Sequence, residues 1–294
     1  HLVPAGTTVG GASSDTVPGA ALPSAVAPHP AVRRHYAATF SVSGRGRFIG
    51  HLDRAEVFRR AVRKAGGRLA LSAGMRPKPL LSLALPLAVG VEGRRELCGF
   101  ELAEDPGPDF ADRLAASLPD HMRLLSLEPY SGARSLAARV VAASYEVVVS
   151  VAPGPAGAGA AAPQAAAPQA AAPQAAAPQA AAELRLGGAS ESGHDLCAVL
   201  AAAADGFRRS PELVVEETRE GRVRRVDVKR YVDVVSVRPG SVRPGSEGLC
   251  TLAFRAAITP DGTARPERVV DALGRLAGIG LSIKKIERIE VYLS

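Results

Sequence analysis

Tryptophan is absent from this chain of 294 residues, and aromatic residues make up only 4% of it. Because 47% of the residues are hydrophobic, the core must be built mostly from leucine, valine and alanine, and the length favours two domains. The aromatic side chains of the basic segment considered below are few, namely Tyr36, Phe40 and Phe48. Stacking of bases on a sheet face, as in RNA-recognition motifs, is therefore poorly supported.

Cysteine is scarce too. Cys98, Cys197 and Cys250 are far apart and lack the paired spacing of a zinc site or an iron–sulfur cluster, so we expect no metal site. An odd, scattered set argues against a disulfide scaffold and fits a reducing cytoplasm, and all three cysteines are expected to be packed or incidental. The P-loop, Gly-x-Ser-x-Gly, zinc-protease and radical S-adenosylmethionine (SAM) cysteine motifs are also missing, and no cofactor is expected.

Two segments lack the apolar periodicity of folded structure. Residues 1–34 are rich in small residues and proline, which predicts a disordered arm rather than a signal peptide. Residues 153–182 carry a repeated proline at every fifth position, and since each proline removes a helix hydrogen bond, we predict a disordered insertion within a folded domain. Outside this tract the chain has no apolar run long enough for a membrane span, and a cytoplasmic location is predicted.

The rest of the chain alternates short strands with amphipathic helices. The first half reads strand–helix–strand–strand–helix–strand over Tyr36–Ser43, His51–Gly66, Leu80–Val91, Glu96–Leu102, Asp109–Leu118 and Met122–Tyr130. After a short helix within 133–143, the second half repeats this plan over Ser144–Val151, Asp195–Ala204, Leu213–Thr218, Arg222–Val228, Val232–Val237, Leu249–Ile258, Pro266–Leu276 and Ile283–Leu293. We therefore predict an α+β protein of two ferredoxin-like (βαββαβ) lobes with antiparallel sheets, at 35–143 and 144–294.

Positive charge gathers in the first half. The net charge is +7, and the segment from Arg33 to Leu80 holds twelve lysines and arginines against two acids, Asp53 and Glu56. This asymmetry suits a phosphate backbone, whose contacts dominate nucleic-acid affinity; the alternative is an arginine bias on a solvated helix face. The side chains predicted to contact nucleic acid are Arg45, Arg47, Arg59, Arg60, Arg63, Arg76 and Lys78. The glycines predicted to allow close backbone approach are Gly44, Gly46 and Gly74.

The arginine-rich helix carries two weak catalytic candidates at its start. His51 could act as a general base that Asp53 orients, but a capping role at the positive end of the helix is favoured. One apolar stripe of this helix is predicted to face the core. It comprises Leu52, Ala55, Phe58, Val62 and Ala65.

A proline-bracketed basic loop, Ala73–Pro79, follows this helix. Its two prolines hold Arg76 and Lys78 in extended backbone. Glu96, which follows two arginines, is predicted to pair with this loop in a structural salt bridge rather than to take part in catalysis.

Four groups of residues resemble a bacterial family of radical-SAM-linked proteins, a domain of unknown function. They are Gly46–Asp53 with the arginine-rich helix, Ser72–Pro79, Ala84–Glu92 with Glu96, and a tail that comprises Val226–Lys229, Thr263–Glu267 and Glu287–Arg288. The family is commonly fused to, or encoded beside, a cobalamin-binding radical SAM protein. The resemblance therefore implies an accessory or substrate-presenting role near such an enzyme, on RNA.

One loop departs from the family pattern. Met75, Lys78 and Leu80 stand where the family has an aromatic residue, a histidine and a lysine. A lysine in place of the histidine keeps a positive contact, which suits anion binding better than catalysis.

These observations lead to one expected function and two alternatives. The leading expectation is an RNA-binding or substrate-presenting module, with RNA and a radical SAM protein as partners and no membrane contact. The first alternative is an RNA-processing or RNA-modifying enzyme that uses His51 and Asp53. The second is a protein-docking module that contacts no nucleic acid.

Overall fold

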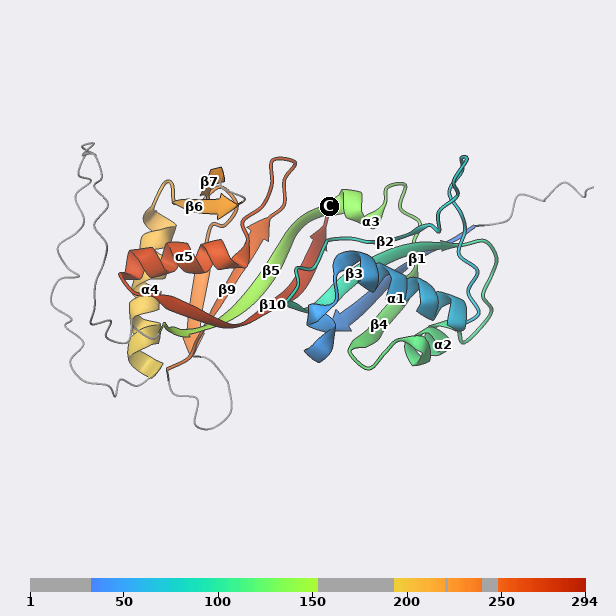
Figure 1. Cartoon of the computed structure of the whole chain (residues 1–294), viewed down its shortest axis with the longest axis horizontal. Helices are drawn as coiled ribbons and strands as arrows, with labels where there is room; N and C mark the ends of the chain where they lie inside the picture. The colour runs from blue at the N-terminus through green and yellow to red at the C-terminus, as the bar shows by residue number, and fades with distance from the viewer. Residues whose placement is uncertain (1–32, 153–192, 220–221, 240–247) are drawn as a thin grey trace, which may run out of the picture. The chain divides into compact units, whose positions relative to one another are not determined.

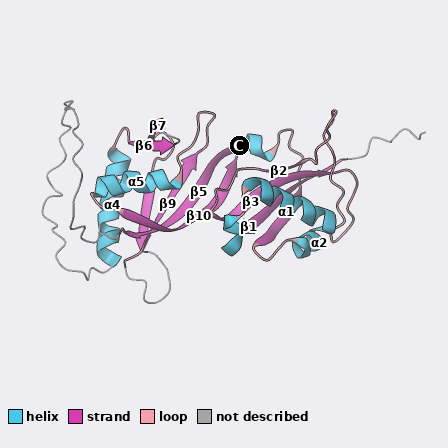
Figure 2. Ribbon diagram, viewed as in Figure 1, coloured by secondary structure: helices cyan, strands magenta, loops and turns pink. Residues whose placement is uncertain are grey.

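The computed structural model of the chain describes residues 33–152, 193–219, 222–239 and 248–294 (Figure 1). The protein has a mixed α+β fold in which most neighbouring strands are antiparallel (Figure 2). The predicted arm, up to residue 32, and the predicted insertion 153–182 lie outside the described residues, whereas Arg34 already begins the first strand. No helix within the described ranges is long and apolar enough to cross a membrane.

The elements follow the predicted order. In the first half they are β1 (Arg34–Val42), η1 (Gly44–Phe48), α1 (His51–Lys64), β2 (Leu81–Leu83), β3 (Glu92–Leu102), α2 (Phe110–Ser117), β4 (Met122–Pro129) and α3 (Leu136–Arg139). In the second half they are β5 (Val140–Val151), α4 (Gly193–Arg209), β6 (Val214–Arg219), β7 (Arg222–Asp227), β8 (Val235–Pro239), β9 (Cys250–Ala257), α5 (Pro266–Ala277) and β10 (Leu281–Leu293). The predicted strand Leu80–Val91 shortens to β2, since proline cannot donate to a strand ladder and Pro86 lies in the loop that follows.

One eight-stranded sheet organises the described chain. Its order is β4-β1-β3-β10-β5-β9-β8, β2 pairs with β3, and β6 and β7 form a separate hairpin. The last strand, β10, is long enough to run along β5 and also to meet β3 in parallel, at Glu287 with Glu92 and Arg288 with Gly93. Two ferredoxin-like lobes with separate antiparallel sheets are therefore not confirmed.

Five aromatic rings pack together in the first half of the molecule: Tyr36, Phe40, Phe58, Phe100 and Phe110. Its strands lie in the order β4-β1-β3-β2, with every pair antiparallel. Phe40 on β1 lies 5.2 Å from Phe58 on α1, and Phe100 on β3 lies 6.5 Å from Phe110 on α2, measured between ring centroids. Helices α1 and α2 therefore cover the same face of these strands.

Helix α1 is rotated relative to the predicted apolar stripe. Leu52 is 78% exposed. At about 100° per residue, Leu52 lies roughly 120° from the centre of the buried stripe, so the prediction that it faces the core is wrong. A charged residue takes a core position instead. The buried residues of α1 are Arg54, Ala55, Phe58, Ala61 and Val62.

A disulfide joins α4 to β9. Cys197 and Cys250 are 53 residues apart in sequence, and their Cα atoms are 5.7 Å apart. The two cysteines meet because α4 packs against β8 and β9. The expectation that all three cysteines are packed or incidental is therefore wrong for this pair, whereas Cys98 is free and buried.

Candidate functional site

Exposed positive charge is concentrated on helix α1 and the segments on either side of it. Seven of the twelve basic residues in this region are exposed and take part in no ion pair within the described chain. They are Arg45, Arg60, Arg63, Lys64, Arg68, Arg76 and Lys78. Five of the seven predicted nucleic-acid contacts belong to this set.

The other five basic side chains of the region have partners inside the protein. Four pair with carboxylates at nitrogen–oxygen distances of 2.9 to 3.6 Å: Arg33 with Glu101, Arg34 with Asp105, Arg47 with Glu92, and Arg59 with Glu56. The fifth, Arg54, is buried. Because Arg47 and Arg59 already have acidic partners, they are weaker candidates for a phosphate contact than the seven exposed residues.

The predicted basic loop is closed by hydrogen bonds at its base. The amide of Ser72 donates to the carbonyl of Lys78 at 2.9 Å, and the amide of Lys78 donates to Ser72 Oγ at 3.0 Å. Gly74 has a φ of +117°, which residues with side chains rarely adopt. The loop thus holds Arg76 and Lys78 in exposed positions on a constrained backbone.

Two of the three predicted glycines serve internal contacts. The amide of Gly44 donates to Oε1 of Glu92 at 3.0 Å. Gly46 is buried, and a Cβ at this position would lie 2.8 Å from the ring of His121. Gly44 also has a φ of +54°, which favours glycine, so both glycines are explained without a bound phosphate. Gly74 differs from them, since it lies at the exposed turn of the basic loop.

Beneath the cationic surface, Arg54 joins two loops. Its side chain is 1% exposed and donates to the carbonyls of Ile49 at 2.7 Å, Leu87 at 3.3 Å and Gly46 at 3.4 Å. Burial lowers the pKa of Arg54, and the nearby carboxylate of Glu96 opposes this effect. Arg54 therefore ties the loop before α1 to the loop before β3.

Arg288 on β10 forms the second buried contact to the same loop. It pairs with Glu96 through both carboxylate oxygens, one of them 2.8 Å from Nε, and it donates to the carbonyls of Leu85 at 3.0 Å and Pro86 at 2.9 Å. Burial acts to lower the pKa of Arg288, but the hydrogen bonds to Glu96 raise it overall. Glu96 thus forms a structural salt bridge, as predicted, but with Arg288 instead of the basic loop.

A chain of ion pairs continues across these strands. Lys285 lies 2.9 Å from Glu92 and 3.3 Å from Glu287, and Arg94 lies 2.9 Å from Glu287. Burial acts to raise the pKa of Glu287, but the hydrogen bond from Arg94 and the charge of Lys285 lower it overall. These carboxylates are neutralised by partners on the sheet and do not compensate the exposed cations of α1.

The predicted acid–base pair is not brought together. Nδ1 of His51 is buried without a hydrogen-bond partner among the described residues, while Asp53 is exposed. Burial lowers the pKa of His51, and the charges of Arg54 and Arg288 lower it further. No hydrogen bond joins His51 to Asp53 in the described chain.

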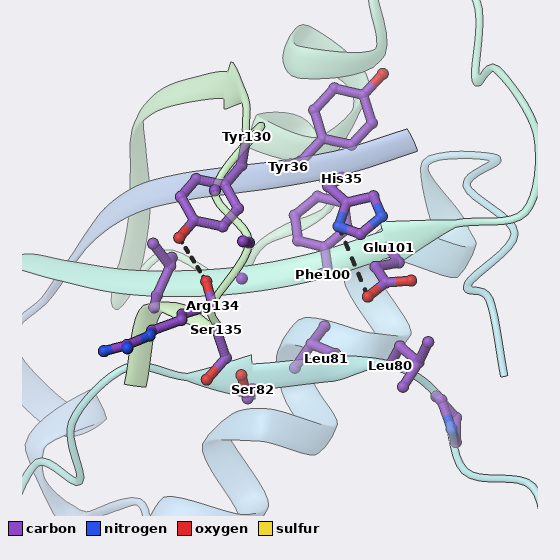
Figure 3. Close-up of a pocket in the computed structure, with 15 residues that line it drawn as sticks. His35, Tyr36, Leu80, Leu81, Ser82, Phe100, Glu101, Tyr130, Arg134 and Ser135 are labelled. Carbon is purple, nitrogen blue, oxygen red and sulfur yellow. Dashed lines mark hydrogen bonds and ion pairs between the residues drawn. The ribbon is translucent and has the colours of Figure 1, made fainter. Parts of the chain in front are cut away.

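A pocket that was not predicted from the sequence lies on the other face of the sheet, away from α1 and α2 (Figure 3). Its volume is about 310 Å³, and it lies between β1, β2, β3 and the segment 130–136. At one end, Nδ1 of His35 lies 3.7 Å from Oε1 of Glu101. At the other end, the hydroxyl of Tyr130 donates to the carbonyl of Arg134 at 2.6 Å.

Gly99 was the one local signal of this pocket in the sequence. A glycine inside a predicted strand marks the close approach of a ligand or another part of the chain. Here a Cβ on Gly99 would lie 3.3 Å from Leu136 of α3, which covers this face. The signal shows where the sheet is hollow, but not which side chains surround the hollow.

Among the comparisons with known proteins, the family match alone supports a conclusion about this chain. No curated protein matches the chain. The crystal structure of an unknown protein from Galdieria sulphuraria aligns at 12% identity over 88% of this chain and 99% of its own, but its TM-score of 0.22 supports no argument about fold. The model of a family described as an uncharacterized protein conserved in bacteria (DUF2344) matches residues 35–266. This range holds most of the chain, and the protein therefore belongs to that bacterial family.

Proposed function

We propose that the protein is an RNA-binding module that holds the phosphate backbone on α1 and on the basic loop. The observation that carries this proposal is the set of exposed cations without described acidic partners, above all Arg60, Arg63, Arg76 and Lys78. Such a side chain gains a charged partner when a phosphate arrives, whereas a side chain in an ion pair must first lose one. Glu56 and Glu92 already lie in ion pairs with other cations, so these carboxylates do not compete for the exposed ones.

We propose further that this module presents RNA to a radical SAM enzyme. The support is the resemblance of Gly46–Asp53, Ser72–Pro79 and Ala84–Glu92 to radical-SAM-linked proteins. The first and third of these segments are tied together by Arg54, which is consistent with a shared role. In the same proposal the first half is a ferredoxin-like lobe, supported by its strand order β4-β1-β3-β2.

Binding of short single-stranded RNA across a salt series tests the proposal. A variant with Arg60, Arg63, Arg76 and Lys78 changed to glutamine removes four cations from the proposed interface. Each phosphate contact on a single strand contributes about 0.7 to the slope of log affinity against log salt, so the slope is expected to flatten by roughly 3.

A matched variant controls for the loss of charge. It changes four exposed cations from β4, α4, α5 and β10 to glutamine: Arg123, Arg209, Arg275 and Lys284. This control is expected to keep most of the wild-type slope. If both variants flattened the slope equally, RNA binding would follow net charge alone. If the wild-type protein bound no RNA, the proposal would be refuted.

Exposed apolar side chains favour protein docking as a second candidate function. Phe48 is 61% exposed and Val89 is 64% exposed, and their loops are joined by the amide of Gly90, which donates to the carbonyl of Arg47 at 2.7 Å. Large exposed apolar residues that lie close together mark interaction surfaces. The test is complex formation with a radical SAM protein after nuclease treatment. Phe48→Ser should weaken that complex, and RNA-dependent association would argue against direct docking.

A further inference from the structure

The pocket of Figure 3 is bordered by a row of side chains that crosses the sheet. His35 lies opposite Glu101 in the pairing of β1 with β3. The amide of Tyr130 donates to the carbonyl of His35, and the amide of Glu101 donates to the carbonyl of Leu80. Residues opposite one another in antiparallel strands point to the same face. Tyr130, His35, Glu101 and Leu80 therefore form one side of the pocket.

The neighbouring row consists of small residues, which hollows the surface of the sheet. Ala37, Gly99 and Ser82 lie opposite one another on β1, β3 and β2. Leu136 of α3 lies over Gly99 and closes part of the hollow. The resulting volume of about 310 Å³ belongs to the size class of sites for small organic ligands.

Glu101 leaves acceptor capacity open toward this pocket. Its carboxylate lies 3.7 Å from His35 and 3.6 Å from Arg33, both longer than a hydrogen bond. An ionised carboxylate has two acceptor oxygens and no donor, so it matches a group with two neighbouring N–H donors. Among the four RNA bases, guanine presents such a pair on its Watson–Crick edge, at N1 and the 2-amino group.

The pocket also adjoins the proposed RNA-binding loop. Pro79 and Leu80 line it, and Lys78 immediately precedes them in the chain. Consecutive Cα atoms are about 3.8 Å apart, so the backbone of Lys78 directly adjoins Pro79 at the edge of the pocket. A phosphate bound by Lys78 is therefore close to the pocket. A nucleotide of the same strand can therefore place its base in the hollow.

We propose that this pocket takes up one unpaired guanine of the bound RNA, with Glu101 accepting hydrogen bonds from N1 and the 2-amino group. The ring of Tyr130 supplies an aromatic wall, as in other sites that read unpaired bases. This inference rests on the proposed function and adds the base that the module selects.

The test uses the full chain with short uridine RNAs that carry one central guanine, adenine, cytosine or uridine. The guanine RNA is expected to bind about tenfold more tightly than the uridine RNA at the same salt concentration. Glu101→Gln should abolish this preference, because an amino donor replaces one acceptor oxygen. Ser82→Leu, which fills the pocket without a change of charge, should abolish it too. Glu104→Gln is the matched control, since it removes the same charge from an exposed residue outside the pocket.

The outcomes separate this inference from the proposed function. Equal binding of the four RNAs, or a guanine preference that survives both pocket variants, overturns the inference and leaves the proposed function standing. Binding of no RNA overturns the proposed function. In that case, titration with guanosine and adenosine monophosphates decides on the pocket: a guanine preference that Glu101→Gln removes sustains it, and equal or absent binding of the two nucleotides overturns it.

Discussion

Arg54 and Arg60 belong to the same helix, α1, and lie in opposite environments. Arg54 is 1% exposed and donates to three backbone carbonyls, whereas Arg60 is exposed and has no ion pair in the described chain. A count of charges along the sequence treats the two residues alike. The basic segment therefore contains two kinds of arginine: some hold its loops in place, and others are exposed and take part in no ion pair within the described residues.

The same contrast occurs between two ion pairs of strand β3. Arg288 and Glu96 are buried, whereas Arg95 and Glu290 form an exposed pair at 3.3 Å. Removing one member of a buried pair leaves an uncompensated charge, while water replaces the lost partner of an exposed one. The effect of a substitution therefore depends on burial more than on the type of pair.

Breaking the buried pair should have the largest effect. Arg288→Met leaves the Glu96 carboxylate unpaired and frees two loop carbonyls, and we expect it to lower the free energy of unfolding by about 3–5 kcal/mol. Arg95→Met, the exposed counterpart, should cost less than about 1 kcal/mol. Urea denaturation measures both values, and similar losses in the two variants would contradict the contrast.

Removing the buried arginine of α1 should have the next largest effect. Arg54→Met leaves the carbonyls of Gly46, Ile49 and Leu87 without this donor, and we expect a loss of about 1–3 kcal/mol in unfolding free energy. Arg60→Met on the exposed side should stay within about 0.5 kcal/mol of wild type. If Arg60→Met were as destabilising, Arg60 would have a structural role that its exposure does not indicate.

Single substitutions on the exposed face should change RNA binding and leave stability intact. Arg63→Gln is expected to flatten the salt dependence of RNA affinity by about 0.7, while the unfolding free energy stays within about 0.5 kcal/mol of wild type. Arg59→Gln is the comparison, because Arg59 already pairs with Glu56 at 2.9 Å. Arg59→Gln should flatten the salt dependence less than Arg63→Gln does. If it flattened the salt dependence more, ion pairing inside the protein would not determine which arginines contact RNA.

The smallest effect concerns pH and the histidine beside the buried arginines. Burial and two positive charges hold the pKa of His51 below its ordinary value of 6.5. The unfolded chain therefore binds more protons below pH 6.5, so stability should fall as the pH drops from 6.5 toward the lower folded-state pKa. NMR titration of the imidazole measures that pKa, and denaturation of His51→Gln should show less of this pH dependence. A folded-state pKa at or above 6.5 would refute the expectation.

Local pattern was sufficient for most of the secondary structure. Helix α1 begins at His51 as predicted, and Pro266 begins α5, because a proline is tolerated in the first turn of a helix. The orientation of α1 was not predictable to the same degree. Leu52 fits the apolar period within the helix, but which stripe faces the sheet depends on the strands that the helix meets.

The candidate site was predictable only in part. The exposed cations Arg60, Arg63, Arg76 and Lys78 follow from composition and spacing, since a charged residue without a specific partner remains at the surface. The pocket does not follow from the sequence in this way. Its side chains come from β1, β2, β3 and the segment after β4, and they meet through strand pairing and the path of that segment over the sheet.

The sequence by itself determined the order of strands and helices, the aliphatic core and the concentration of positive charge near α1, because each depends on residues close together along the chain. Only the tertiary structure decided which arginines are buried, which cysteines pair and where a pocket forms. Glu96 and Arg288 are separated by 192 residues, and their pairing requires β10 to return beside β3. A buried charge is stable only with such partners, and partners from distant segments are a property of the folded chain.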